Sequence, residues 1–381
     1  MVLTDLPEPS WIDRPQQLVD MSQVLARQPI LAVDTESNSL HAYQEQVCLI
    51  QFSTREIDYL VDPLALDDIT QLGELFANPA IEKVFHAAEY DVICLKRDFG
   101  FRFANLFDTM AAGRILGREA VGLAAMMEEA FGISLDKHYQ RANWGQRPLS
   151  AAMKSYARMD THYLVALRDR LKDELVAAGR WELAEEDFNR LCAVNGHNGH
   201  SNSNDESPSA FWRISGIQDL SPHQLSVMRE LYEYRDEQAR LTNQPQFKIL
   251  SNQVLLEVAQ TCPHYIQELR LLPSISDLQI RRHGKALLEA VRRGAQAPPL
   301  ERPSPRRTEE QVKIRLEQLR NWRKKAGKEM GVESDVVLPR DVLYTIAIAN
   351  PCSMEDLAKT MQSIPWRYKR FGREIFKALG H

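Results

Sequence analysis

The chain has 381 residues, of which 44% are hydrophobic and 26% are charged, and its formal net charge is −5. This length exceeds one ordinary domain and predicts two or three folded units with real cores. No apolar run approaches the roughly 20 residues that cross a bilayer, no N-terminal signal segment is evident, and the five cysteines form no CxxC, so we expect a cytoplasmic protein without a disulfide framework or a thiolate zinc site.

The charge is distributed unevenly along the chain. Residues 1–195 hold 19 Lys and Arg against 30 Asp and Glu, whereas residues 300–381 hold 17 against 11. The acidic N-terminal part and the basic C-terminal part therefore indicate different functions: metal binding or chemistry in the first, and binding of a polyanion in the second.

The first unit, residues 1–194, alternates between short β-rich runs and helical patterns. Strands are expected at 29–37, 47–53, 57–63 and 81–86, and helices at 88–99, 123–131 and 150–178. This mixture predicts an α/β domain with a central sheet flanked by helices.

Two segments of unusual composition divide the rest of the chain. Residues 195–209 are rich in Asn, Ser and Gly and predict a flexible linker, and residues 295–307 are rich in Pro and predict a stiffer, extended spacer. The units between and after them, 210–294 and 308–381, are copies of each other, because eleven residues are identical at an offset of 88, including Arg235 with Arg323 and Leu250 with Leu338. Both copies have helical spacing of apolar residues and predict small all-α modules.

The stretch "LAVDTES" places two acids in an apolar strand. Asp34 and Glu36 are two residues apart, so their side chains project from one face of the strand with Cα atoms about 6 to 7 Å apart. Taken alone, a hydrated strand end explains this pair better than a functional site, because short acidic motifs occur often by chance.

Two further acidic positions change that interpretation. Asp91 lies one turn into a helix that follows a strand, and Tyr156 and Asp160 lie four residues apart on one face of a later helix. Each of these also has an ordinary structural explanation: a first-turn acid favoured by the helix dipole, and the edge of an amphipathic helix.

The order of these five residues resembles the DEDD superfamily of 3′-to-5′ exonucleases in its tyrosine branch. The stretches "FHAAEYDVICLKRDFG", "LFDTMAAGRILG" and "NWGQRPLSAAMKSYARMDTHYL" are similar to ribonuclease D, and the helical repeat resembles two HRDC modules. The histidine branch would have His at position 155, which is Ser155 here. The resemblance implies a ribonuclease H-like mixed sheet flanked by helices, followed by two helical HRDC modules at 210–294 and 308–381.

The same resemblance implies a cofactor and a role for each acid. Two divalent ions, Mg²⁺ or Mn²⁺, would assist phosphodiester hydrolysis, and such hard cations prefer oxygen ligands. Asp34 would bridge the ions, Glu36 and Asp160 would complete the ion that activates water, and Asp91 would hold the second. Tyr156 would orient the attacking water.

Other residues are weaker candidates for substrate binding. Phe85 could stack on the terminal base beside His86, although a strand-end Phe is more often in the core, and Asp108 is better explained as a helix N-cap than as a site acid. Basic residues of the loop before the last catalytic helix could meet phosphates: Lys137, Arg141 and Arg147. The second copy mixes cations with aromatic residues and is the better candidate for gripping RNA, through Trp322, Lys324, Arg367 and Arg370.

These observations predict a metal-dependent 3′-to-5′ exoribonuclease. It would release nucleoside 5′-monophosphates from RNA with a free 3′ end, with precursor tRNA as the expected substrate, and would act as a monomer away from membranes. Two alternatives stay open: a DNA 3′-to-5′ exonuclease acting in repair, and a non-catalytic RNA-binding scaffold, against which the intact acid set argues.

Overall fold

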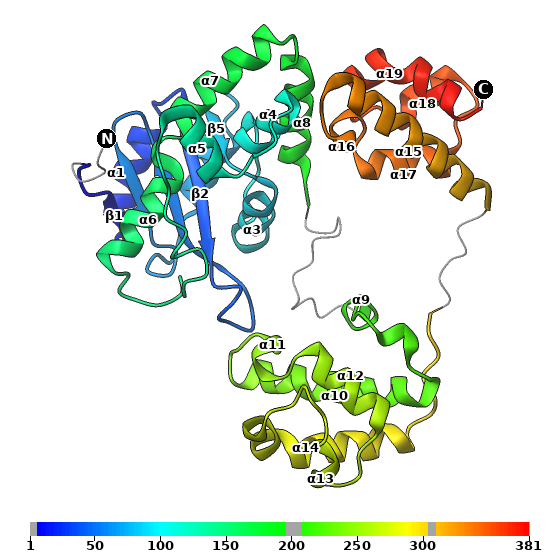
Figure 1. The fold of residues 1–381 in the computed structure, drawn as a ribbon. Helices are drawn as coiled ribbons and strands as arrows, with labels where there is room; N and C mark the ends of the chain where they lie inside the picture. Colours follow the sequence, from blue (N-terminus) through cyan, green and yellow to red (C-terminus); the bar gives the residue numbers. More distant parts are fainter. Residues whose placement is uncertain (1–5, 196–207, 304–309, 381) are drawn as a thin grey trace. The chain divides into compact units, whose positions relative to one another are not determined.

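The computed structural model describes residues 6–195, 208–303 and 310–380, so most of the predicted linker at 195–209 lies outside the described residues (Figure 1). The chain divides into two compact units. One comprises residues 1–37, 47–196 and 307–381, and the other comprises residues 38–46 and 197–306. No helix in the described ranges has the length and apolar character needed to cross a membrane.

Residues 10–108 contain a six-stranded mixed sheet with strand order β1-β4-β3-β2-β5-β6. The strands are β1 Ser10–Ile12, β2 Ile30–Ser37, β3 Val47–Ser53, β4 Asp58–Val61, β5 Glu82–Phe85 and β6 Leu106–Asp108. The β2–β3 and β3–β4 pairs are antiparallel, and the other three pairs are parallel. The predicted α/β architecture is confirmed. The three-residue edge strands β1 and β6 were not predicted, because a run that short shows no periodicity.

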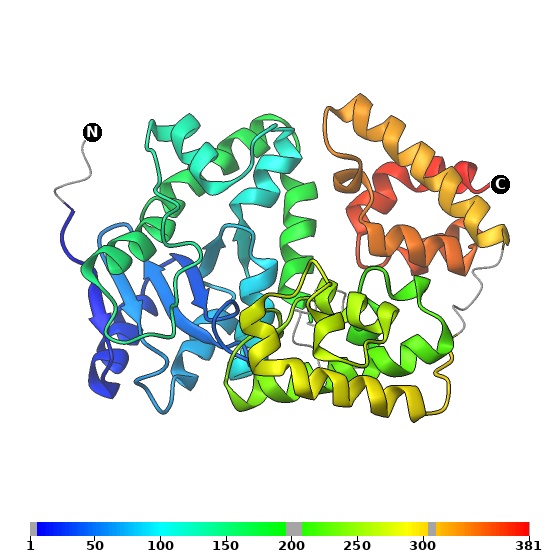
Figure 2. The same cartoon turned by 60° about the horizontal axis from the view of Figure 1, so that its bottom comes forward.

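Helices cover both faces of this sheet (Figure 2). They are α1 Pro15–Leu25, α2 Thr70–Ala77, α3 Glu89–Phe99, α4 Thr109–Leu116, α5 Leu123–Phe131, α6 Ala151–His162, α7 Leu164–Ala177 and α8 Trp181–Ala193. In β2, Leu31 and Val33 pack in the same core cluster as α1, α2 and α3, whereas Ile30 and Ala32 pack with α4, α5, α7 and α8. Side chains alternate along β2, so each residue nearer the carboxyl end of the strand faces either the α1–α3 layer or the layer of α4, α5, α7 and α8.

The two helical modules repeat the same order of helices. The first module (residues 208–303) contains α9 Pro208–Trp212, a 3₁₀ helix at Ile217–Asp219, α10 Pro222–Leu241, α11 Gln246–Ile249, α12 Asn252–Thr261, α13 Ile266–Leu269 and α14 Asp277–Gln296. The second module (residues 310–380) contains α15 Glu310–Met330, α16 Ser334–Val337, α17 Arg340–Ala349, α18 Met354–Thr360 and α19 Pro365–Ala378. The bounds of α11 and α12 recur in α16 and α17 at the predicted offset of 88, so the interpretation as a tandem helical repeat is confirmed.

The Pro-rich segment does not begin as a free spacer. Helix α14 continues to Gln296, and the following residues pack back on the first module. Ser226 Oγ donates to the Pro298 carbonyl (2.7 Å), the Leu300 amide donates to the Pro222 carbonyl (3.0 Å), and Arg302 donates to two carbonyls. The prediction of a spacer was wrong up to about residue 302, because proline excludes helix without preventing an extended chain from packing.

The second module is docked on the α/β domain through a buried ion pair. The Arg367 side chain is fully buried; its Nη1 donates to Glu186 Oε1 (2.6 Å) and its Nη2 to Asp187 Oδ2 (2.9 Å), both in α8. The Trp366 amide donates to the other Glu186 oxygen (2.6 Å), and the Val336 carbonyl accepts two further bonds from Arg367. The module is therefore part of the same compact unit as the sheet.

Further contacts extend this interface. Three arginines of the α/β domain bond to the second module: Arg114 to Asp335 (2.7 Å), Arg180 to the Met330 carbonyl (2.6 Å) and Arg190 to Asp341 (2.9 Å). Gly117, at φ +83°, faces the Gly331 carbonyl so closely that a Cβ would lie 2.3 Å from that oxygen. Glycine is required there by both the backbone conformation and the close approach.

Candidate active site

The two acids of "LAVDTES" lie at the carboxyl end of β2. Asp34 and Glu36 continue the side of the strand that carries Ile30 and Ala32, as period-two alternation predicts. The register with β3 shifts directly after Glu36, where the strand ends in a bulge. The pair therefore projects from the rim of the sheet on the face covered by α6, which packs against β2, β3 and β4.

Helix α6 supplies the tyrosine and the last acid. Ser150 caps this helix by accepting a hydrogen bond from the Met153 amide (3.2 Å), which fixes where the helix begins. The Tyr156 ring packs on Tyr139 and Trp144 of the preceding loop, at centroid distances of 5.8 and 6.0 Å. The tyrosine ring is thus held by neighbouring aromatic rings while Asp160 follows one turn later.

Asp91 approaches from the other face of β2. It lies in the first turn of α3, is 6% exposed, and accepts a hydrogen bond from the Thr35 hydroxyl. Since Thr35 points to the face opposite Asp34 and Glu36, it connects the α3 layer to the acidic pair. Thr35 was not among the predicted site residues; its position between the two acids places its side chain on the opposite face of the strand, but the sequence does not show which helix covers that face.

Asp108 fixes the position of Asp91 indirectly. Its carboxylate caps α4 by accepting from the Met110 and Ala111 amides, so its interpretation as an N-cap is confirmed. The same carboxylate accepts from the amides of Ala87 (3.1 Å) and Ala88 (2.8 Å) at the start of α3. Ala87 has φ +63°, and this second set of bonds stabilises that strained turn.

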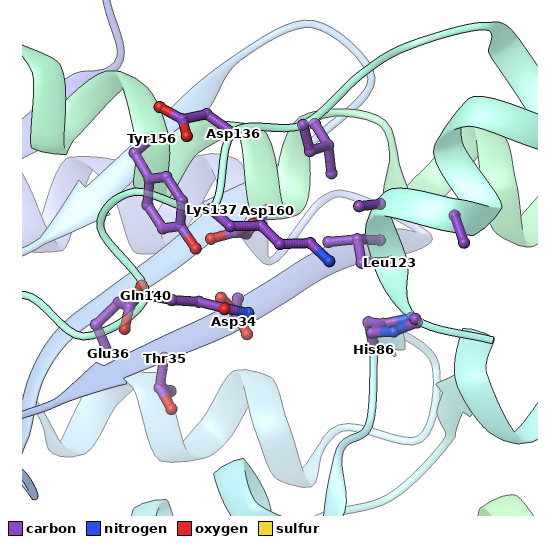
Figure 3. A pocket seen from close by; sticks show the side chains of 14 residues that line it. Asp34, Thr35, Glu36, His86, Leu123, Asp136, Lys137, Gln140, Tyr156 and Asp160 are labelled. Carbon is purple, nitrogen blue, oxygen red and sulfur yellow. The ribbon is translucent and has the colours of Figure 1, made fainter. Parts of the chain in front are cut away.

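A pocket of about 390 Å³ opens between β2, α5 and α6. Figure 3 shows the side chains of Asp34, Glu36, Tyr156 and Asp160 facing this pocket. The remaining lining residues are Thr35, His86, Gly122, Leu123, Ala124, Ala125, Leu135, Asp136, Lys137 and Gln140. Asp91 lies behind this lining rather than in it, at the end of its bond to Thr35.

The electrostatics of the site reflect crowded acids. Burial, followed by the charges of Asp91, Asp160 and Glu36, raises the pKa of Asp34 well above its usual range. Burial, followed by the charges of Asp160 and Asp91, raises the pKa of Glu36 well above its usual range. Burial raises the pKa values of Asp91 and Asp160 to about 7. Burial and the nearby carboxylates also raise the pKa of Tyr156, which keeps its hydroxyl protonated.

Repelling carboxylates of this kind fit a divalent cation. The donor set is all oxygen, which matches Mg²⁺ or Mn²⁺ and not Zn²⁺, and a cation would relieve the repulsion that raises these pKa values. Among the described residues, no three His, Cys, Asp or Glu side chains already stand in an arrangement that could hold an ion.

The other predicted substrate contacts have mixed outcomes. Phe85 is fully buried in the α1–α3 core, so the prediction that it stacks on a base was wrong; the alternative of a core residue fits. His86 does line the pocket, with Nδ1 hydrogen-bonded to Thr109 Oγ1 (2.9 Å). Burial lowers the pKa of His86, so its ring is neutral at neutral pH.

Arg147 is a structural clamp. Its Nε and Nη2 donate to both carboxylate oxygens of Asp62 (2.6 Å each), which is 3% exposed. It also donates to the carbonyls of Cys48, Trp144 and Gln146. With its donors already used, Arg147 is not free for a phosphate, and the prediction of an RNA contact was wrong.

The predicted RNA-binding residues of the second module divide into two groups. Arg367 is buried against α8, so its prediction was wrong. Lys324 is exposed, Arg370 is 57% exposed and pairs with Glu374 (3.5 Å), and Trp322 is half-buried against Phe371. These three stay predictions.

The pocket wall also contains a lysine and a glutamine that lie outside the recognised motifs. The side chains of Lys137 and Gln140 line the same pocket as Asp34 and Asp160 (Figure 3). Both come from the loop after α5, and Lys137 was predicted to meet phosphate only as one of several loop cations. A lysine facing several carboxylates can attract a phosphate into the pocket.

Comparison with known proteins identifies the family. The profile of a 3′-5′ exonuclease domain matches residues 9–176, and the HRDC domain profile matches residues 224–291 and 313–379. The crystallised catalytic core of RRP6 from Trypanosoma brucei is 31% identical, with a TM-score of 0.66, and the match covers 78% of this chain and 82% of that one. The chain belongs to the ribonuclease D and RRP6 family of 3′-5′ exonucleases.

Curated proteins that are similar to this chain belong to the same exonuclease family. The exosome complex exonuclease RRP6 of Saccharomyces cerevisiae is 34% identical over 297 residues, and the chain spans only 40% of the length of that relative. Ribonuclease D of Pseudomonas paraeruginosa is 29% identical over 381 residues, with 98% of both chains covered. The structure of Escherichia coli RNase D, at 23% identity and a TM-score of 0.69, shares the fold over 98% of this chain. DEDD exonucleases depend on divalent metal ions.

Proposed function

We propose that this protein is a 3′-to-5′ exoribonuclease that releases nucleoside 5′-monophosphates. The observation that carries the proposal is the convergence of Asp34, Glu36 and Asp160 with Tyr156 on one pocket, with Asp91 behind it. Ribonuclease D and RRP6 relatives support RNA as the substrate. Precursor tRNA, a monomeric state and a cytoplasmic location are further parts of the proposal.

The four acids would hold two divalent cations, Mg²⁺ or Mn²⁺. Such ions would supply charge neutralisation at the phosphate and activation of water. The residues of the chain do the remaining work. The protonated Tyr156 hydroxyl can donate a hydrogen bond to align the attacking water, and the neutral His86 can hydrogen-bond to the terminal nucleotide from the opposite wall.

Lys137 suits the incoming strand. Its ammonium faces the pocket, and the structure gives it no carboxylate partner within hydrogen-bond distance in the described part of the chain. A phosphate that enters the pocket would replace the water around the Lys137 ammonium. The resulting charge-assisted hydrogen bond favours a negatively charged substrate over a neutral one. Gln140 beside it offers a donor and an acceptor to the terminal nucleotide.

The test uses RNA labelled at its 5′ end, with Mg²⁺ and then with EDTA. Shortening from the 3′ end should require the metal and yield nucleoside 5′-monophosphates. Asp34→Asn should lower the rate by at least about 10³-fold, which corresponds to about 4 kcal/mol of transition-state stabilisation. Asp136→Asn, which removes the same charge from the rim of the pocket, is the matched control and should retain most of the activity.

Two results would reject the proposal. Shortening that persists in EDTA and in Asp34→Asn would exclude a site built from these acids, and a protein that binds RNA but never shortens it would be the non-catalytic scaffold. A matched DNA strand tests the remaining alternative: degradation of DNA at a rate equal to or above that of RNA would indicate a DNA exonuclease.

A further inference from the structure

The second module carries two arginines against one tyrosine and a third arginine close to them. The guanidinium carbons of Arg320 and Arg340 each lie 5.7 Å from the centre of the Tyr344 ring, and Arg320 Nη2 donates to the Tyr344 hydroxyl (2.8 Å). Arg323 lies on the same helix as Arg320 and donates to the Leu338 carbonyl (2.9 Å). We call Arg320, Arg323, Arg340 and Tyr344 the arginine cluster. Within the described residues, none of its arginines forms an ion pair with a carboxylate.

The first module lacks this cluster. At the positions 88 residues earlier it has Tyr232, Arg235, Asn252 and Leu256. Both terminal nitrogens of Arg235 bond to neutral acceptors: Nη1 donates to Asn252 Oδ1 (2.7 Å) and to the Leu250 carbonyl (3.3 Å), and Nη2 donates to Gln246 Oε1 (3.0 Å). The buried arginine is therefore a structural feature of the module fold, and its polar partners come from the module itself.

In the second module two of those acceptors are replaced. Arg340 occupies the position of Asn252, and Ser334 that of Gln246. Among the described residues, Arg323 keeps the Leu338 carbonyl as its hydrogen-bond acceptor. Burial lowers the pKa of Arg323; the charge of Asp335, which is bonded to Arg114, opposes this shift, and the positive charges of Arg320 and Arg340 add to it. The arginine that has amide acceptors in the first module thus lies beside two further positive charges in the second, and an anion bound there would relieve their mutual repulsion.

The surroundings of the arginine cluster favour RNA as that anion. Tyr344 is only partly buried, and Ile348, one turn further along α17, is 66% exposed, so an apolar surface lies beside the cations. Lys324, one turn after Arg320 on α15, is exposed as well. The acid nearest in sequence, Asp341, is occupied by Arg190 of α8. Guanidinium groups next to an aromatic ring bind the phosphates and stack against the bases of a single strand.

We propose that Arg320, Arg340 and Tyr344 form a binding site for single-stranded RNA on the second module, separate from the pocket that takes the 3′ end. This inference rests on the proposed exoribonuclease function and specifies where the body of the substrate is held. It replaces the predicted RNA contact through Arg367, which is buried. It also assigns RNA binding to the second copy of the repeat.

The first experiment measures the affinity of the full-length protein for a labelled single-stranded RNA in EDTA. Arg340→Asn restores the acceptor that the first module gives its buried arginine, so this variant should stay folded. Together with Arg320→Gln it should weaken RNA binding about tenfold, and it should reduce the slope of log affinity against log salt by about 1.4, because each lost phosphate contact on a single strand contributes about 0.7. Lys313→Gln with Lys359→Gln removes the same charge from exposed ion pairs of the same module and should change neither quantity.

The second experiment separates this inference from the proposed function. The Arg320→Gln, Arg340→Asn protein should hydrolyse a trinucleotide as fast as the unaltered protein, and on a long RNA its KM should rise while kcat is unchanged. Equal affinity and equal salt slope in this variant and in the lysine control would overturn the RNA site, even if the enzyme degrades RNA. An unaltered protein that degrades no RNA would overturn the proposed function, and the binding measurement would still decide the RNA site.

Discussion

Replacing Arg367 by methionine should detach the second module from the α/β domain. The change keeps most of the side-chain volume and removes the charge from a site where the arginine is fully buried and Glu186 is 5% exposed. Of its hydrogen bonds to the described residues, Glu186 would keep the one from the Trp366 amide. A buried carboxylate that loses its cation costs about 3 to 5 kcal/mol.

The comparison variant is Arg370→Met on the same helix. Arg370 and Glu374 are 57% and 50% exposed, so solvent screens their pair and its loss should cost less than about 1 kcal/mol. The double variant Glu186→Gln, Arg367→Met removes both charges and should be less destabilised than Arg367→Met alone.

Amide hydrogen exchange in α8 and α19 is the suitable measurement, because a chain with two compact units does not unfold in one step. A loss of 3 kcal/mol or more corresponds to exchange at least about 10²-fold faster at the interface, since each 1.4 kcal/mol is a factor of ten. If α19 exchanges at the same rate in Arg367→Met and Arg370→Met, the ion pair does not hold the module in place.

Three further predictions concern the site and its supports. Tyr156→Phe should lower kcat by about 10²-fold in single-turnover assays without changing RNA affinity, because only the hydroxyl that aligns water is lost; an unchanged kcat would remove Tyr156 from the chemistry. In EDTA, thermal stability should fall as pH rises from about 4 to 7, because Asp91 and Asp160 hold protons in the folded state that the unfolded chain has already lost. Asp160→Asn should make stability less dependent on pH. Stability that rises with pH over that range would contradict the raised pKa values of these two acids. Arg147→Ala should destabilise the α/β domain by about 3 kcal/mol, because it leaves the buried Asp62 without its cation, and should speed amide exchange in β3 and α6 by about 10²-fold while RNA affinity stays the same. Weaker RNA binding by a variant with unchanged exchange would restore Arg147 as a substrate contact.

Local periodicity accounts for the part of the site that could be predicted. Asp34 and Glu36 share a face because a strand repeats every two residues, and Tyr156 and Asp160 share one because a helix repeats every 3.6. The bond between Thr35 and Asp91 could not be predicted, because it depends on which helices cover each face of the sheet.

The burial of Arg367 could be predicted from the sequence, but its partner could not. Arg367, Phe371 and Ile375 are the buried face of α19 and follow one another every four residues, so the sequence already places the arginine on the core side. Charge and neighbouring aromatics suggested a surface for RNA instead. Its partner Glu186 could not be predicted, since it lies 181 residues away in the chain.

That separation has a topological consequence. The contact between Glu186 and Arg367 closes the chain into a non-covalent loop that contains the whole first module. The entropy cost of closure grows only with the logarithm of loop length, so a long insertion is inexpensive once the contact forms. A single proteolytic cut between α8 and α15 would therefore not release a fragment: the second module would stay bound by its buried arginine, and the first module would stay covalently attached at one end.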